Sequence, residues 1–249
     1  MMSVSRRALL QLTGTAAGGL ALSQLAHAPA QAAQPMEAAL QRELKACSPP
    51  SDPLQALLAR NAIFSKAWQR LARETSPEAR IRIKAEIFNG GCQINPLALE
   101  QGQRPWAALL SCADARVAPE FVFASGSGEL FQVRSAGNTA FDDAIASLEY
   151  AVAVLGVPLI VVMGHSGCGA VKAAIASDPL TPLLEELVKP IRASLVSGDS
   201  LSQAIQGNAR YAAGQLTARS PVLKDAAASG KVKIISAYFD IGSGVVSLI

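Results

Sequence analysis

Apolar residues along the chain form short continuous runs that alternate with stretches of helical periodicity. The runs predict five strands, at 106–111, 130–135, 158–163, 231–238 and 244–248. Alternation of such strands with helices is typical of an α/β fold, a central, mostly parallel sheet flanked by helices. The last run follows the turn at Gly242-Ser243-Gly244, so we expect it to pair antiparallel at the C-terminal edge of the sheet.

Helical periodicity first appears in residues 53–90, which we predict to be an N-terminal helical arm ahead of the sheet. Ser51 or Asp52 is expected to cap its first helix, and a second helix begins near Ser76 and ends at Gly90-Gly91. Further helices are expected at 142–155 and after Gly169, Thr181 and Ser200.

The N-terminal segment resembles an export signal rather than part of the fold. Ser5-Arg6-Arg7 precedes a moderately apolar stretch without acidic residues, in the manner of a twin-arginine signal. We therefore divide the chain into an export signal at 1–32, a linker at 33–52 and one α/β domain at 53–249. The prediction is a periplasmic or otherwise exported protein with no stable membrane association after processing.

Charge and composition exclude several functional classes. Half of the residues are apolar, which is enough for a sizeable core. The formal net charge of +3 falls to about +1 when Arg6 and Arg7 are removed with the signal. This balance does not indicate a nucleic-acid partner. Processing also removes His27, which leaves His165 as the single histidine and excludes both a three-histidine zinc site within one chain and a histidine proton shuttle.

Two strand ends carry residues with ligand chemistry. The run 159–163 ends in a glycine-rich turn that holds His165 and Cys168, and the run 106–111 ends in Cys112-Ala113-Asp114-Ala115-Arg116. If that second stretch stays extended, Cys112, Asp114 and Arg116 point to one side. Two cysteines and one histidine are a zinc set with the fourth position open, which is the pattern of a catalytic site.

Other interpretations of these residues explain less. The turn at Gly164 begins like the nucleophile turn of a serine hydrolase, but no second histidine is present to activate Ser166. A Cys–His nucleophile pair, with His165 as the base for either cysteine, leaves the Asp and Arg without a role. Cys47 and Cys92 are interpreted as small buried or spare thiols, with a disulfide between them as the alternative.

Taken together, these motifs resemble those of the β-class carbonic anhydrases. Cys112-Ala113-Asp114-Ala115-Arg116 is similar to that family's Cys-x-Asp-x-Arg motif, and His165-Ser166-Gly167-Cys168 to its His-x-x-Cys motif. The likeness continues through 128–138, Ser220-Pro221-Val222-Leu223 and 238–245, and covers roughly residues 54 to 249.

The resemblance implies a zinc enzyme that hydrates CO2 reversibly to bicarbonate and a proton by zinc-bound hydroxide. Cys112, His165 and Cys168 would hold Zn2+, while Asp114 either takes the fourth position in a closed state or pairs with Arg116. It also implies a homodimer or a dimer of dimers. The alternatives are a COS or CS2 hydrolase on the same zinc site and a non-catalytic zinc-binding oligomeric module.

Overall fold

The computed structural model describes residues 49–88, 96–100, 102–176 and 178–249. These residues belong to one compact unit. Its helices and strands, in chain order, are α2 (Pro53–Leu71), α3 (Pro77–Phe88), α4 (Pro96–Glu100), β1 (Ala107–Cys112), α5 (Pro119–Val122), β2 (Leu130–Ser135), the 3-10 turn η1 (Ala136–Asn138), α6 (Asp142–Ala153), β3 (Leu159–His165), α7 (Gly169–Ile175), α8 (Pro182–Arg192), α9 (Leu201–Arg219), α10 (Pro221–Ala228), β4 (Lys233–Asp240) and β5 (Val245–Leu248).

The five strands form one sheet in the order β2-β1-β3-β4-β5. All neighbouring pairs are parallel except β4 and β5, which pair antiparallel through Ala237↔Leu248. This topology confirms the predicted fold class, including the antiparallel strand at the C-terminal edge. The boundaries of the predicted strands differ by up to two residues, because strand ends are set by pairing with neighbours rather than by the apolar run alone.

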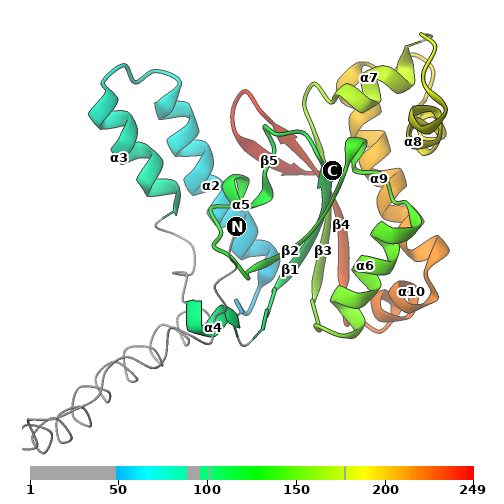
Figure 1. Cartoon of the computed structure of the whole chain (residues 1–249), viewed down its shortest axis with the longest axis horizontal. Helices are drawn as coiled ribbons and strands as arrows, with labels where there is room; N and C mark the ends of the chain where they lie inside the picture. The colour runs from blue at the N-terminus through cyan, green and yellow to red at the C-terminus, as the bar shows by residue number, and fades with distance from the viewer. Residues whose placement is uncertain (1–48, 89–95, 101, 177) are drawn as a thin grey trace, which may run out of the picture. The chain divides into compact units, whose positions relative to one another are not determined.

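Alternate residues of the central strands face two separate cores. Leu109 and Val161 belong to the core beneath α2, α3 and α5, whereas Leu110 and Val162 belong to the core beneath α6, α9 and α10. Figure 1 shows these two helical layers on opposite sides of the sheet. Because these strands are buried on both faces, their sequences are continuous apolar runs.

Sequence rules anticipate the start of α2 and miss three short helices. Asp52 caps α2, and its side chain accepts from the amide of Gln55 at 3.0 Å, as expected. α4, α5 and α10 were not predicted, because segments of 4 to 8 residues are too short to show helical periodicity. The export signal, most of the linker and both Cys47 and Cys92 lie outside the described residues.

Helix α2 packs on the β4–β5 turn. Phe64 is buried in the core and stacks on Trp68 with ring centroids 5.4 Å apart, and Trp68 is partly buried and packs against that core. Gly244 lies directly against them, where an added Cβ would be 3.1 Å from two atoms of Trp68. Among the helices of the described residues, none is long and apolar enough to span a bilayer.

We expect Gly244→Ala to lower the free energy of unfolding by about 1–3 kcal/mol, because the left-handed backbone at φ +76° disfavours a side chain and Trp68 leaves no room for it. Gly242→Ala is the matched control, since its Cβ would meet only the Asp240 carboxylate at 3.6 Å or more. Denaturant unfolding measures both variants. Equal stability of the two variants would contradict this account of the α2 contact.

Candidate metal centre

Three candidate ligands meet at the carboxyl edge of the sheet. Cys112 is the last residue of β1, His165 is the last residue of β3, and Cys168 precedes α7 as its N-terminal cap. Strands β1 and β3 are parallel neighbours, with Ser111 opposite Met163. The chain runs from β1 outward to β2 and then crosses back to β3, so this is the switch point where open α/β sheets bind ligands.

The ligand atoms of these residues lie close enough to hold one ion. The two Sγ atoms and an imidazole nitrogen are all within 4.8 Å of one another, and the three side chains are buried. The structure thus brings together Cys112, His165 and Cys168, the three residues that were proposed as ligands from the sequence.

The imidazole of His165 is oriented by its own loop. Nδ1 lies 3.1 Å from the carbonyl oxygen of Ser166, which can only accept, so Nδ1 carries the proton and Nε2 has a free lone pair. Nε2 is buried and has no hydrogen-bond partner among the described residues. A buried nitrogen without a partner is costly unless something fills its lone pair, and a metal ion would do so.

Backbone amides surround the two sulfurs. The amide of Gly137 donates to the Sγ of Cys112 at 3.3 Å, and the amides of Ala170 and Val171 contact the sulfur of Cys168. The Cys168 thiol hydrogen-bonds to the Cys112 sulfur, which lowers the pKa of Cys112 to about 4 and raises the pKa of Cys168. The centre therefore stabilises one thiolate even before an ion is considered.

Gly137 directs its amide at the sulfur through a left-handed backbone conformation. Its φ is +75°, and an added Cβ would lie 2.6 Å from Cδ1 of Ile191. Its carbonyl accepts from Nδ2 of the buried Asn208 at 2.8 Å. This turn is consequently held from both sides, and only glycine fits it.

Asp114 and Arg116 form a close pair beside the ligands. Arg116 donates from Nε to Oδ1 at 2.9 Å and from Nη2 to Oδ2 at 2.6 Å. These bonds hold the pKa of Asp114 well below its usual value, and Oδ2 lies 3.8 Å from Nε2 of His165. The carboxylate thus stays ionised at the edge of the metal centre, with both oxygens engaged by Arg116.

The expected extended course of residues 112–116 is wrong. The chain turns after Asp114, whose Oδ1 accepts from the amide of Arg116 at 2.9 Å and whose carbonyl accepts from Val117 at 3.1 Å. An Asp side chain often replaces the strand ladder with such a local bond. The two side chains meet through this turn, not through the period of a strand.

Arg134 is a site residue to which sequence reasoning assigned no role. From β2 it donates through Nε to the carbonyl of Cys112 at 3.1 Å and through Nη2 to that of Asp114 at 2.8 Å. It holds the loop that carries a ligand and the Asp–Arg pair. The sequence signal that could have identified Arg134 is its position near the end of the predicted strand 130–135, which follows the strand that ends at Cys112.

The donor set fits Zn2+. Two thiolate sulfurs and one neutral imidazole nitrogen suit this borderline-soft ion, and three protein donors leave one of its four positions for another ligand. The amides around the sulfurs and the carbonyl on His165 are the supporting bonds that such ligands need.

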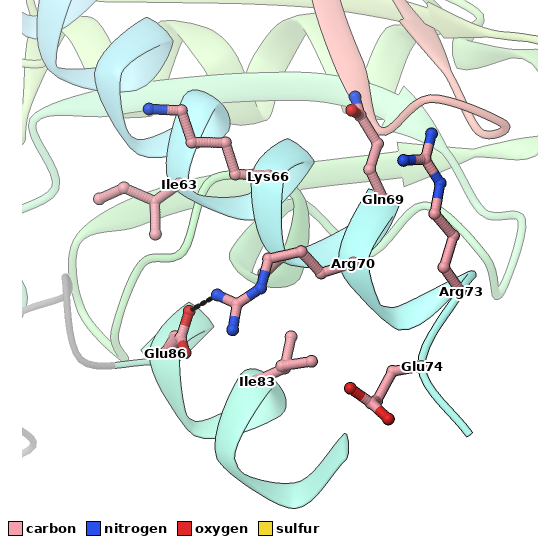
Figure 2. Close-up of a pocket in the computed structure, with 9 residues that line it drawn as sticks. Ile63, Lys66, Gln69, Arg70, Arg73, Glu74, Ile83 and Glu86 are labelled. Carbon is pink, nitrogen blue, oxygen red and sulfur yellow. Dashed lines mark hydrogen bonds and ion pairs between the residues drawn. The ribbon is translucent and has the colours of Figure 1, made fainter. Parts of the chain in front are cut away.

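A separate cavity of about 620 Å³ lies between α2 and α3, and none of its lining residues belongs to the metal centre. Figure 2 shows it lined by charged side chains of both signs, with Arg70 bonded to Glu86 across it. Two buried apolar side chains, Ala67 and Ile83, also line it. The cavity therefore lies within the arm.

A mostly parallel sheet with a Cys–His–Cys cluster at its carboxyl edge defines an α/β protein with three donors that could hold one metal ion. Residues 107–246 match the sequence model of the family described as carbonic anhydrase. The chain belongs to the carbonic anhydrase family, a family of enzymes, and its structural neighbours indicate the β class.

Three relatives illustrate the similarity. The chain is 38% identical over 155 residues to carbonic anhydrase 2 of Mycobacterium tuberculosis, covering 59% of this chain and 75% of that protein. It is 36% identical over 160 residues to the carbonic anhydrase of Mycolicibacterium smegmatis, covering 61% and 78%. The solved β-carbonic anhydrase of Coccomyxa, in complex with acetazolamide, has a TM-score of 0.56 at 27% identity, covering 62% of this chain and 76% of that one.

The pKa of Cys112 predicts a thiolate in the metal-free protein at about pH 6, well below the usual cysteine value of about 8.5. Because the folded-state pKa is the lower one, ionisation stabilises the fold at alkaline pH, and this contribution is lost as the pH falls toward 4. The ultraviolet thiolate absorbance of the metal-free protein, minus that of Cys112→Ser, should correspond to one thiolate per chain. A difference of zero up to about pH 8 would refute this account of the sulfur pair.

Proposed function

We propose that this chain catalyses the reversible hydration of CO2 to bicarbonate and a proton, at a Zn2+ ion held by Cys112, His165 and Cys168. One observation carries the proposal: the Asp114–Arg116 pair stands beside a buried three-donor cluster, with Oδ2 of Asp114 3.8 Å from Nε2 of His165. A site that only retained metal would need neither charged residue.

A bound Zn2+ supplies the nucleophile at neutral pH, because it lowers the pKa of a coordinated water. The residues of the protein would hold the ion and balance its charge. Cys112 and Cys168 provide two negative charges, and the amides of Gly137, Ala170 and Val171 keep those charges solvated inside the protein.

Arg116 keeps the Asp114 carboxylate ionised and oriented toward the guanidinium group. A carboxylate held by two charge-assisted bonds stays ionised and is a weak base at neutral pH, so Asp114 would accept a hydrogen bond from a water molecule at the fourth position and orient it without taking its proton. Released from Arg116, the same carboxylate is tethered near enough to become a ligand itself. We infer that this pair gates the fourth position.

The proton leaves without a histidine relay. The sequence has two histidines, and His27 falls in the proposed signal while His165 is committed as a ligand. Proton transfer therefore passes from the edge of the site to water and buffer in the solvent. Arg116 lies at that edge with its side chain 55% exposed.

Two wider proposals accompany the activity. We infer that the chain assembles as a homodimer or a dimer of dimers through its arm, where Ile81 of α3 is 68% exposed and Ile63 of α2 is 39% exposed. Export to the periplasm by the twin-arginine-type segment at 1–32 rests on the sequence alone.

Asp114→Asn tests the function directly. We expect it to retain one zinc per chain and to lose roughly 10²-fold or more in CO2 hydration, because an amide cannot accept the same bonds from Arg116 and water. Stopped-flow rates and metal analysis measure the two effects separately. Asp178→Asn, at an exposed carboxylate outside the site, is the matched control and should keep full activity.

The outcomes separate the alternatives. Full CO2 activity in Asp114→Asn would refute the role of the pair. Faster initial rates on COS or CS2 than on CO2 would identify a hydrolase of sulfur analogues. Retention of zinc with no turnover of any of these substrates would identify a binding module. Inactivation by thiol alkylation without loss of metal would indicate a cysteine enzyme.

A further inference from the structure

The β4–β5 turn is held tightly by side chains of α2. Trp68 donates from Nε1 to the carbonyl of Ile241 at 2.8 Å, and Gln69 donates from Nε2 to that of Ser243 at 3.1 Å. The buried Asn61 donates to the carbonyl of Gly244 at 3.0 Å and accepts from the amide of Val246 at 2.8 Å. These bonds couple the position of the β4–β5 turn to that of helix α2.

The other side of this turn contacts Ser166, the residue that follows His165. The amide of Ile241 donates to Oγ of Ser166 at 2.9 Å, and the hydroxyl bonds in turn to the carboxylate of Asp240. The amide of Ser166 donates to the carbonyl of Phe239 at 2.9 Å, which extends the β3–β4 pairing by one residue. Ser166 is thus fixed at both its amide and its hydroxyl.

The remaining polar group of Ser166 orients the imidazole. Its carbonyl oxygen lies 3.1 Å from Nδ1 of His165, and this contact leaves Nε2 as the ligand atom. A bond of this kind sets both the tautomer and the ring orientation of a metal-binding histidine. A displacement of the Ser166 peptide would therefore shift the acceptor of Nδ1 and reorient the imidazole relative to the two sulfurs.

We propose that Ser166 is a positioning residue, which links helix α2 through the β4–β5 turn to the orientation of His165 and so to metal affinity. The inference rests on the proposed zinc site. It goes beyond that site because it gives helix α2, which lies outside the metal centre, an influence on the zinc affinity.

Ser166→Ala removes the hydroxyl and leaves the amide of Ile241 without its acceptor. We expect zinc affinity to fall about 10- to 100-fold, the usual effect of losing a residue that supports a ligand. Competition with a chromophoric chelator measures the affinity, and the visible spectrum of the cobalt-substituted protein reports the ligand geometry. Circular dichroism of the metal-free variant establishes that it is folded.

Two further variants separate positioning from general stability. Ser166→Thr keeps a hydroxyl and should restore most of the affinity. Ser243→Ala is the matched control, because it removes a hydroxyl that bonds to the same Asp240 carboxylate at 2.6 Å without being one of the contacts to Ser166. Wild-type affinity in Ser166→Ala, or an equal loss in Ser243→Ala, would overturn the proposal.

The link to α2 is tested with Trp68→Phe, which removes the donor to Ile241 and keeps an aromatic ring against Phe64. It should weaken zinc binding severalfold in the wild-type background and much less in the Ser166→Ala background, since both changes act through one turn. Strictly additive effects would contradict the link. If the wild-type protein binds no zinc, the proposed function fails; if it does and Ser166→Ala binds equally well, only this inference fails.

Discussion

The metal centre depends on the parallel pairing of β1 with β3 at the reversal of strand order. The register of Ser111 with Met163 places the end of one strand beside the end of the other, so that Cys112 and His165 face one point. The turn between β3 and α7 then brings in Cys168, three residues after His165. Residues more than fifty positions apart are thereby brought together by backbone hydrogen bonds of the sheet, which do not depend on an ion.

Concentrating sulfur and carboxylate charge at one buried point requires compensation. The structure provides it with oriented amides on the sulfurs, a bidentate guanidinium on Asp114 and a second guanidinium, that of Arg134, on the loop between them. Buried charge without such partners is costly. In the proposed function the same groups would also decide the chemistry, because Arg116 keeps the Asp114 carboxylate ionised and bonds to both of its oxygens.

Much of this arrangement is predictable from sequence because it follows from short-range rules. Continuous apolar runs identify the buried strands, and His165 and the two cysteines stand at strand ends where α/β sheets place their sites. The contacts that orient these residues are not predictable in the same way. The turn at Asp114, the clamp by Arg134 and the contact of Ser166 with the β4–β5 turn join segments whose separation depends on the folded backbone.

The proposed activity requires that two sulfurs and one imidazole nitrogen bind a single zinc ion. X-ray absorption at the zinc edge of the purified full chain measures this directly. We expect two sulfur neighbours at about 2.3 Å and a nitrogen at about 2.0–2.1 Å, with one further light atom completing a tetrahedron. A shell of four sulfurs, a shell without sulfur, or a folded and active protein that contains no zinc would contradict it.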